Sequence, residues 1–394
     1  MRVSVLLTVD VPSTASFEQI EQVCLRACRA TGRQALEQVL ARREQQRRRR
    51  RAKGWGRRRT VLTRMGYVSF RRGRSRRADG SRFFPLDEHL GLPAHHEASP
   101  WVRGRGCELA AGHPYREAAR LLSAEVGAPL DHRAVWRWVQ AEGDARLKQR
   151  AEAINRLFED GEPPPAPNEP VPDVLTVGID ATGIRMQDGT KASAKLAVAF
   201  TASEPLPAKG KRRLARRTVF AEIAEVDEFG MALAHELERR YGAHRIARMM
   251  VLGDGEPWIE GLTRSWLPTA RYQCDWWHVG AKVRQLCRDE LYRFPRLRRR
   301  AFRATARLAS DLVAGRVGGD PEEARLLGGY LARNGPHLHT FQAMGPGHWL
   351  HGSGPAEKHI ELTINRRFKR RGMSWSHRGA RNLLALRLEV IAST

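Results

Sequence analysis

The second half of the chain carries a hydrophobic pattern that predicts a sheet flanked by helices. Residues 174–179 form a nearly continuous apolar run, which is typical of a buried central strand. Within 227–241, apolar residues recur instead at helical spacing. The predicted elements are, in order, strands at 174–179, 195–200 and 217–222, a helix at 227–241, a strand at 246–252, a helix at 257–267 and a strand at 271–274. This order predicts an α/β fold with a mixed five-stranded sheet.

The first half of the chain is predicted to begin with a helix and a small β module. Residues 3–11 are apolar but short and carry Asp10, so they predict a strand or a lead-in to the helix and not a signal peptide. Residues 16–53 are predicted to be largely helical. Between Thr60 and Phe84, short apolar runs among many arginines predict a small basic β module.

A helical hairpin is predicted within residues 114–142. An apolar stripe marks a first helix at 115–125, a turn with glycine and proline follows, and Asp131 can cap a second helix that ends near Ala141. The basic second helix is what a helix-turn-helix places in the major groove of DNA. A hairpin used only for packing or dimerisation has the same pattern. The second helix is expected to turn Val135, Trp138 and Val139 inward and His132, Arg133 and Arg137 outward.

A proline-rich stretch at 159–173 marks a domain boundary, because proline removes amide donors and favours an extended spacer. An arginine-rich stretch at 209–217 lies between two predicted strands and is expected to form an exposed hairpin loop. The predicted organisation is a basic N-terminal helix and β module at 1–105, a helix-turn-helix at 106–158, the linker at 159–173, a first core part at 174–280, a helical insertion at 281–350 and the final core helices at 351–394.

The charge of the chain points to a polyanionic partner. Lys and Arg number 69 against 43 Asp and Glu, which leaves a formal net charge of +26. A chain this basic repels itself unless an anion compensates the charge. No uncharged apolar run approaches the length needed to span a bilayer, so nucleic acid is the expected partner. The block from Arg47 to Arg59 suits phosphate contacts, although a solvated, disordered tail has the same composition.

The cysteines indicate a reducing compartment. Their odd number argues against a secreted disulfide framework, and the lack of Cys-x-x-Cys spacing argues against a structural zinc site. The five cysteines are Cys24, Cys28, Cys107, Cys274 and Cys287.

Three acidic residues lie at predicted element ends that suit metal-dependent chemistry. Asp180 ends the first strand, Asp254 follows the fourth, and Glu357 lies in the first turn of a helix predicted over 355–370. Two divalent ions about 3.5–4 Å apart need bridging oxygen ligands, which carboxylates supply. Each acid also has a structural interpretation, as a turn residue or as a capping residue with Gly354 at the N-cap. Rival acids, which rank lower by position, are Asp188, Glu256, Asp275 and Glu361.

Motifs around these acids resemble those of a known group. The motifs are, in order, YREAARLLSAEVGAPLDHRAVWRWVQ at 115–140, GIDATGIR at 178–185, LGDGEPWI at 252–259, DWWH at 275–278, GSGPAEKH at 352–359 and RRFKRRGMSWSHRGARNLLALR at 366–387. In this ordered set, the chain resembles the DDE-type insertion-sequence transposases of bacteria, in particular the ISKra branch and its ISLre-like relatives. The resemblance extends from about residue 60 to the end of the chain.

The resemblance implies an RNase H-like core in which the first and fourth strands lie side by side. It implies that Asp180, Asp254 and Glu357 bind two Mg²⁺ or Mn²⁺ ions, and that Asp275 and His278 form the (C/D)-x-x-H signature of Mutator-like relatives. A core histidine bonded to a backbone carbonyl is the alternative for His278, and a helix cap is the alternative for Asp275. The implied activity is DNA cleavage and strand transfer at the ends of an insertion sequence.

The resemblance also implies partners and a location. The partners are double-stranded DNA, at the transposon ends and at the target, and further copies of the chain in a homodimer or higher oligomer, with no membrane. The implied location is the bacterial cytoplasm, at the nucleoid. Many relatives carry cysteine pairs near residues 71–82, and their absence here argues against a zinc-stabilised module. DNA contacts are expected from Arg133, Arg137, Arg47, Arg50, Arg57, Arg58, Arg366 and Arg367.

Two other functions share these features. A metal-dependent nuclease has the same core but joins no strands, and a domesticated transposase acts as a DNA-binding regulator without catalysis. The three acids argue against the regulator. Joining of a supplied 3′-OH end to a second duplex separates a transposase from a nuclease.

Overall fold

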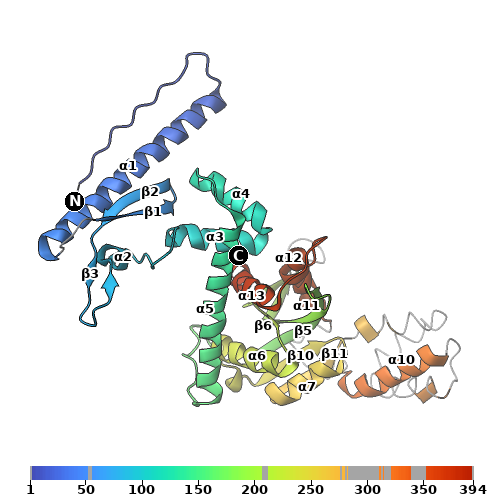
Figure 1. The fold of residues 1–394 in the computed structure, drawn as a ribbon. Helices are drawn as coiled ribbons and strands as arrows, with labels where there is room; N and C mark the ends of the chain where they lie inside the picture. Colours follow the sequence, from blue (N-terminus) through green and yellow to red (C-terminus); the bar gives the residue numbers. More distant parts are fainter. Residues whose placement is uncertain are drawn as a thin grey trace. The chain divides into compact units, whose positions relative to one another are not determined.

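A five-stranded mixed sheet forms the centre of the second half of the chain (Figure 1). Its strands are β5 (Val174–Arg185), β6 (Lys191–Phe200), β9 (Thr218–Ile223), β10 (Arg248–Gly253) and β11 (Ala270–Cys274). They lie in the order β11-β10-β5-β6-β9. The β5–β6 and β6–β9 pairs are antiparallel, and the β5–β10 and β10–β11 pairs are parallel. The predicted α/β class with a mixed five-stranded sheet is therefore confirmed.

The structure is a computed structural model that describes residues 2–51, 56–205, 212–275, 277–279, 282, 310–311, 314, 321–338 and 352–392. It divides into two compact units, Met1–Glu142 (unit 1) and Gly143–Thr394 (unit 2). Among the described residues, no helix combines the length and the apolar character that crossing a bilayer requires.

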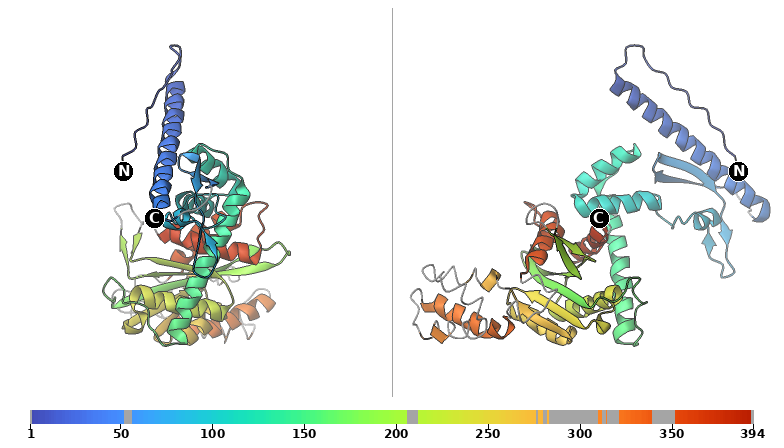
Figure 2. Two further views of the ribbon diagram at one scale, coloured as in Figure 1. Left: turned by 60° about the vertical axis from the view of Figure 1, so that its left-hand side comes forward. Right: turned by 180° about the vertical axis from the view of Figure 1, so that it is seen from behind.

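Helices cover both faces of the sheet in unit 2. On one face, α6 (Val226–Tyr241) and α7 (Pro257–Trp266) pack on Leu175, Val177 and Ile179 of β5. The opposite face is covered by α11 (Gly354–His359), the π-helix η4 (Ile360–Asn365), α12 (Arg366–Phe368) and α13 (His377–Ala392). Figure 2 shows these two layers, yellow and red, on opposite sides of the green strands. Because the first half of β5 is covered on both faces, residues 174–179 form a nearly continuous apolar run.

The helix that carries Glu357 is continuous but widens in its middle. Helix α11 passes into η4, where hydrogen bonds run from residue i to i+5, and then into α12. The guanidinium of Arg387 in α13 donates to the carbonyls of Leu362 and Thr363 within the π-helical stretch. Burial lowers the pKa of Arg387. The helix ends at Phe368, close to the predicted end, but the sequence did not predict its π-helical part.

Other parts of unit 2 depart from the predicted elements. Strand β5 does not end at Asp180 but continues to Arg185, because β6 pairs with it along residues 176–185. Residues 159–173 contain neither helix nor strand. The arginine-rich stretch belongs to a hairpin whose tip, 206–211, lies outside the described residues. The hairpin strands are β7 (Ala202–Pro205) and β8 (Arg212–Ala215). Of the predicted insertion, the described elements are α10 (Pro321–Asn334) and the 3-10 turn η3 (Gly335–His337).

Unit 1 begins with the predicted helix and β module. Helix α1 (Phe17–Arg51) packs on the hairpin of β1 (Arg57–Thr63) and β2 (Gly66–Arg72). Their common core is Leu40, Val61, Val68, Phe70 and Leu86. Smaller elements follow, namely β3 (Ser75–Arg76), β4 (Arg82–Phe83) and α2 (Pro85–His89). Residues 2–12 form no strand and lead into α1 as irregular chain, which is the second of the two predicted alternatives, and Leu6 is 87% exposed.

Part of the basic block is buried inside unit 1. Arg59 Nη1 lies 2.7 Å from the carboxylate of Asp87, and Arg72 contacts the same carboxylate. Arg59 also donates to the carbonyls of Pro93 and His96 at 2.8 and 2.7 Å. Burial and the charge of Arg59 lower the pKa of Arg72 to about 10. These two guanidinium groups are largely buried and pair with Asp87 inside unit 1.

Three helices complete unit 1, namely α3 (Pro100–Gly112), α4 (Tyr115–Val126) and the start of α5 (His132–Phe158). Helix α4 ends at Gly127, whose φ of 65° is left-handed. Val135 and Val139 are buried as predicted. Helix α5 does not end near Ala141 but runs for 27 residues into unit 2. Gly143 lies in this continuation and packs closely on Asn382 of α13 (His377–Ala392).

The crossing of α5 and α13 gives the first testable prediction. A Cβ at Gly143 would lie 2.5–2.7 Å from the Cβ, Cα and O atoms of Asn382, and backbone atoms cannot give way cheaply. We expect Gly143→Ala to destabilise unit 2 by about 1–3 kcal/mol, measured by urea unfolding. Gly261→Ala in α7 is the matched control, since its Cβ would meet nothing within 4 Å. That variant is expected to gain about 0.5–1 kcal/mol. Equal effects of the two changes would contradict the close crossing.

Candidate functional site

Three acidic residues lie in or directly after adjacent parallel strands: Asp180 within β5, Asp254 after β10 and Asp275 after β11. The β10–β5 ladder pairs Leu252 with Gly178, and two residues further on it sets Asp254 level with Asp180. The β10–β11 ladder, continued by one residue, sets Asp275 level with Asp254. Neighbouring strands lie about 4.8 Å apart, so these side chains start from adjacent points of the backbone. Sequence reasoning placed Asp180 and Asp254 at the ends of neighbouring strands. The two strands are neighbours and Asp254 follows β10, but Asp180 lies within β5.

Helix α11 brings Glu357 to the same face of the sheet. A Cβ at Gly178 would lie 3.5 Å from the Cβ of Ala356, so the first turn of α11 rests on β5 two residues before Asp180. Side chains two residues apart in a strand share a face. The N–H of Glu357 donates to the carbonyl of Ser353 at 3.1 Å, and Ser353 is the N-cap. The helix thus begins one residue earlier than predicted, with Glu357 still in its first turn.

Asp275 is the centre of a hydrogen-bond network that fixes the position of Glu357. Its carboxylate, in a residue 1% exposed, accepts from His278 Nδ1 at 2.9 Å, from the Ser353 N–H at 2.9 Å and from the Trp277 N–H at 2.7 Å. The Ser353 hydroxyl lies 2.8 Å from Asp275 and 2.9 Å from Glu357, and its one proton serves one of them at a time. These hydrogen bonds therefore hold the DWWH motif and the turn before α11 together.

His278 bonds the carboxylate of Asp275. The hydrogen bond to Asp275 fixes the proton on Nδ1 and raises the pKa of His278 above its usual value. The other nitrogen, Nε2, lies 3.5 Å from Glu357 Oε1. Burial raises the pKa of Asp275, but the hydrogen bonds from His278, Ser353 and Trp277 outweigh burial and hold that pKa below its usual range.

The pKa of Asp180 is raised well above its ordinary value. Burial raises the pKa of this carboxyl group to about 6, against an ordinary value of 3.8. The negative charges of Asp254 and Glu357 are smaller contributions to this value, whereas the Ala181 N–H, 2.7 Å from Asp180, and the charge of His278 act in the opposite direction. The carboxylates of Asp254 and Glu357 therefore lie near enough to Asp180 to influence it.

Helix α10 supplies residues that the sequence did not identify. The Tyr330 hydroxyl donates to the Asp254 carbonyl at 2.7 Å, and the Asn334 side chain donates to the Gly255 carbonyl at 3.2 Å. Gly255 has a φ of 91°, and a Cβ there would lie 2.6 Å from the Tyr330 hydroxyl, so only glycine fits this turn. These contacts hold the turn that carries Asp254. No local pattern predicts them, because they join residues separated by more than seventy positions in the chain.

The acids suit hard divalent cations. Ligand atoms of Asp275, His278 and Glu357 lie within 4.8 Å of one another, as a metal site requires. The oxygens of Asp275 already accept hydrogen bonds from three residues, which leaves them little capacity for a metal. Asp180 and Asp254 are not part of this group, which joins Glu357 to the DWWH motif.

The C-terminal arginines divide between surface and core. Arg366 is exposed, with Nε 3.5 Å from Glu361. Arg367 is fully buried, with its guanidinium 5.1 Å from the Trp375 ring. The expectation of a DNA contact at Arg367 is therefore wrong, because its side chain packs inside unit 2.

The N-terminal arginines divide in the same way. Arg57, Arg58, Arg133 and Arg137 are exposed. Arg47 is half-buried and donates to the Pro85 carbonyl at 2.8 Å. The side chain of Arg50 lies outside the described residues.

Comparison with known proteins places the chain in a family. The model of the "Uncharacterised protein family (UPF0236)" matches residues 13–312, more than half of the chain. The chain belongs to the UPF0236 family. The matched range contains Asp180, Asp254, Asp275 and His278, and ends before Glu357.

Two relatives show how far the similarity extends. A UPF0236 protein in the vanSb 3′ region of Streptococcus gallolyticus is 32% identical over 134 residues, which cover 34% of this chain and 27% of that protein. A UPF0236 protein of Caldanaerobacter subterraneus subsp. tengcongensis, whose name joins eleven loci, is 20% identical over 344 residues, which cover 84% of this chain and 67% of that protein. The match to the first relative thus spans about a quarter of that protein's length.

The raised pKa of Asp180 predicts how stability depends on pH. The folded chain holds this proton more tightly than the unfolded chain, so the free energy of unfolding falls as pH rises from about 4 to about 6. Without divalent cations, we expect Asp180→Asn to be more stable than the natural chain by roughly 2 kcal/mol at pH 7.5. The difference should vanish below about pH 4, and urea unfolding at both pH values measures it.

Asp188→Asn is the control for this experiment. Asp188 is exposed, and hydrogen bonds from Thr190 lower its pKa, so the expected change in stability has the opposite sign. A loss of stability at pH 7.5 on Asp180→Asn would show that the three acids do not repel one another.

Proposed function

We propose that this protein is a DNA transposase of the DDE type with an RNase H-like core. The observation that carries the proposal is the position of Asp180 in β5 and of Asp254 directly after the adjacent parallel strand β10, with Glu357 set on the same face by α11. The charges of Asp254 and Glu357 contribute to the raised pKa of Asp180, which supports acids from three distant segments lying near one another. Such a cluster suits binding of two Mg²⁺ or Mn²⁺ ions.

The strand order supports the RNase H-like assignment. The order β11-β10-β5-β6-β9 corresponds to 5-4-1-2-3 in the order of the chain, with the second strand antiparallel to its neighbours. Helices α6 and α7 follow the third and fourth strands and cover one face. This is the arrangement that an RNase H-like core with acids on its first and fourth strands requires.

The chain's own groups prepare the site for phosphodiester chemistry. Asp180, Asp254 and Glu357 would hold the divalent ions, which when bound activate the nucleophile and stabilise the leaving 3′ oxygen. Asp275 holds the Nδ1 proton of His278, and His278 Nε2 faces Glu357 Oε1. His278 and Ser353 therefore orient the carboxylate of Glu357, since both lie within 3.5 Å of it.

DNA recognition is assigned to the helical hairpin of unit 1. We propose α4 and α5 as a helix-turn-helix, because the left-handed Gly127 joins them and Arg133 and Arg137 are exposed at the start of α5. The net charge of +26 supports a nucleic-acid partner. A relative whose name joins eleven loci fits a mobile element, because such an element multiplies within its host genome.

Substitution of the acids tests the catalytic part of the proposal. We expect Asp254→Asn and Glu357→Gln each to lower Mg²⁺-dependent cleavage of element ends by about a thousandfold, since each removes a metal ligand worth several kcal/mol. Duplex binding, measured by fluorescence anisotropy, should not change. Glu361→Gln is the matched control, one helical turn beyond Glu357 and exposed.

A supplied end with a free 3′-OH separates the transposase from the nuclease. With the natural chain and Mg²⁺, we expect the labelled end to become joined to a second duplex. Accumulation of nicks without joined product would indicate a nuclease. Full activity in both Asp254→Asn and Glu357→Gln would contradict the assignment of these acids as metal ligands.

The helix-turn-helix assignment has its own test. Arg133→Ala/Arg137→Ala is expected to reduce the preference for element ends over random duplex by roughly 1–3 kcal/mol. Arg116→Ala/Arg120→Ala, two exposed arginines on α4, should weaken both duplexes equally. Equal loss of preference in both variants would place sequence recognition elsewhere.

A further inference from the structure

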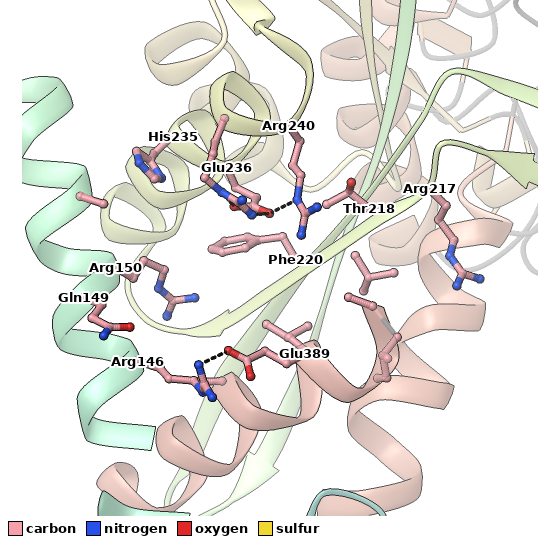
Figure 3. Close-up of a pocket in the computed structure, with 17 residues that line it drawn as sticks. Arg146, Gln149, Arg150, Arg217, Thr218, Phe220, His235, Glu236, Arg240 and Glu389 are labelled. Carbon is pink, nitrogen blue, oxygen red and sulfur yellow. Dashed lines mark hydrogen bonds and ion pairs between the residues drawn. The ribbon is translucent and has the colours of Figure 1, made fainter. Parts of the chain in front are cut away.

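A second basic feature lies in unit 2, away from the carboxylate cluster. A cavity of about 500 Å³ opens between α5, α6, α13 and the edge strand β9 (Figure 3). Its walls carry five arginines, Arg146, Arg150, Arg217, Arg239 and Arg240, against two glutamates, Glu236 and Glu389. The cavity therefore has an excess of positive charge.

The cavity continues into a neighbouring one. A second cavity of about 410 Å³ shares Arg217, Thr218, Arg239 and Arg240 with the first and reaches the proline-rich segment at 165–169. The two form one elongated depression, here called the arginine groove. An elongated basic groove suits a chain of phosphates better than one compact anion.

The arginines of the groove keep donors for a ligand. Glu236 accepts hydrogen bonds from both Arg239, at 2.7 and 2.9 Å, and Arg240, at 3.1 Å, so one carboxylate serves two guanidinium groups. The side chains of Arg239 and Arg240 are 41% and 47% exposed. Arg217 is exposed and forms no ion pair with an acid of the described residues. Each guanidinium has five N–H donors, more than these contacts use.

The walls of the groove are fixed by packing. Arg150 is anchored by Glu222 at 2.8 Å and lies 5.3 Å from the ring of Phe220, and Arg146 is held by Glu389 at 2.8 Å. Figure 3 shows Arg146 and Arg150 reaching from α5 and Arg240 from α6, with Phe220 of β9 between them. Because rigid elements carry these side chains, the basic groups are arranged before a ligand binds.

The groove and the acids lie at different places on the sheet. Thr218 begins β9 at the far edge from β11, and the register relates it through Ala199 to Val177, three residues before Asp180. Two strand spacings of about 4.8 Å therefore separate β9 from β5. A phosphate in the groove is thus not the phosphate at the carboxylates.

We propose that the arginine groove binds the phosphate backbone of a nucleic acid strand at a place distinct from the carboxylate cluster. The proposal takes its ligand from the function proposed above but does not depend on catalysis. In that setting, the groove would hold DNA that flanks the reacting end or belongs to the target.

Arg217→Gln/Arg240→Gln in the full chain tests the groove. This double variant leaves the Glu236–Arg239 pair intact, so the fold should be kept. Anisotropy with a random-sequence duplex should show roughly tenfold weaker binding at about 0.1 M salt, with a salt slope smaller by about 2. Arg248→Gln/Arg264→Gln removes two exposed charges outside the groove and is expected to change affinity less than about twofold. Equal weakening in both double variants would overturn the proposal.

A charge change of the opposite sign gives an independent test. Glu389→Gln removes an acid from the groove and releases Arg146, so duplex binding should become about threefold tighter. Unchanged or weaker binding would contradict the groove. The Glu389→Gln test remains valid even when Arg217→Gln/Arg240→Gln fails to fold.

Two competitors identify the ligand class. Polyglutamate and inorganic phosphate are titrated against the duplex with the natural chain and with both double variants. If the groove variant loses affinity for polyglutamate or phosphate but not for the duplex, the groove serves an acidic protein or a small anion, and the proposal is wrong.

These experiments test the groove proposal and the proposed transposase activity separately. All binding arms are repeated in the Asp254→Asn background, where no cleavage is expected. If the groove variants bind the duplex more weakly but the natural chain does not cleave DNA, the groove proposal stands and the transposase proposal is wrong. If the natural chain cleaves DNA but the groove variants bind the duplex normally, the transposase proposal stands and the groove proposal is wrong.

Discussion

The parallel pairing of β5 with β10 is the constraint on which the candidate site depends. It sets Asp180 level with Asp254, although the two are far apart in the chain. Burial of a carboxylate is unfavourable and is the main cause of the raised pKa of Asp180, to which the charges of Asp254 and Glu357 add. The packing of the sheet between two helical layers supplies the stability that keeps the acids together. A divalent cation would turn the same repulsion into a binding site.

The elements that complete the site come from distant parts of the chain. Asp275 ties the end of β11 to the turn before α11, and Tyr330 ties α10 to the turn after β10. Each contact fixes a backbone segment that carries one acid. In a two-metal mechanism, small displacements of ligands change activity, so the surrounding hydrogen bonds matter almost as much as the acids themselves.

Some arginines of this chain stabilise the fold, and others stay available for a partner. The amino-acid composition does not distinguish the two groups. Arg59 and Arg72 share the buried Asp87, and Arg367 packs against Trp375 inside unit 2. Others, such as Arg217 and Arg240, stay at the surface with donors to spare. A net charge of +26 thus overstates the charge presented to a partner, and the geometry of each side chain decides its availability.

The sequence by itself determined the α/β class, the order of strands and helices in unit 2 and the long first helix, because local hydrophobic periodicity encodes these directly. It also proposed Asp180, Asp254 and Glu357 as candidate ligands, because each was expected at the end of a strand or in the first turn of a helix. It misjudged the end of β5, the end of α5 and the burial of Arg367, because all three depend on partners distant in the chain. Tertiary structure alone decided the register that aligns the acids, the hydrogen bonds that Asp275 and Tyr330 make, and the groove formed by α5, α6, α13 and β9. Such contacts arise when separate segments pack together, and no local pattern of residues specifies them.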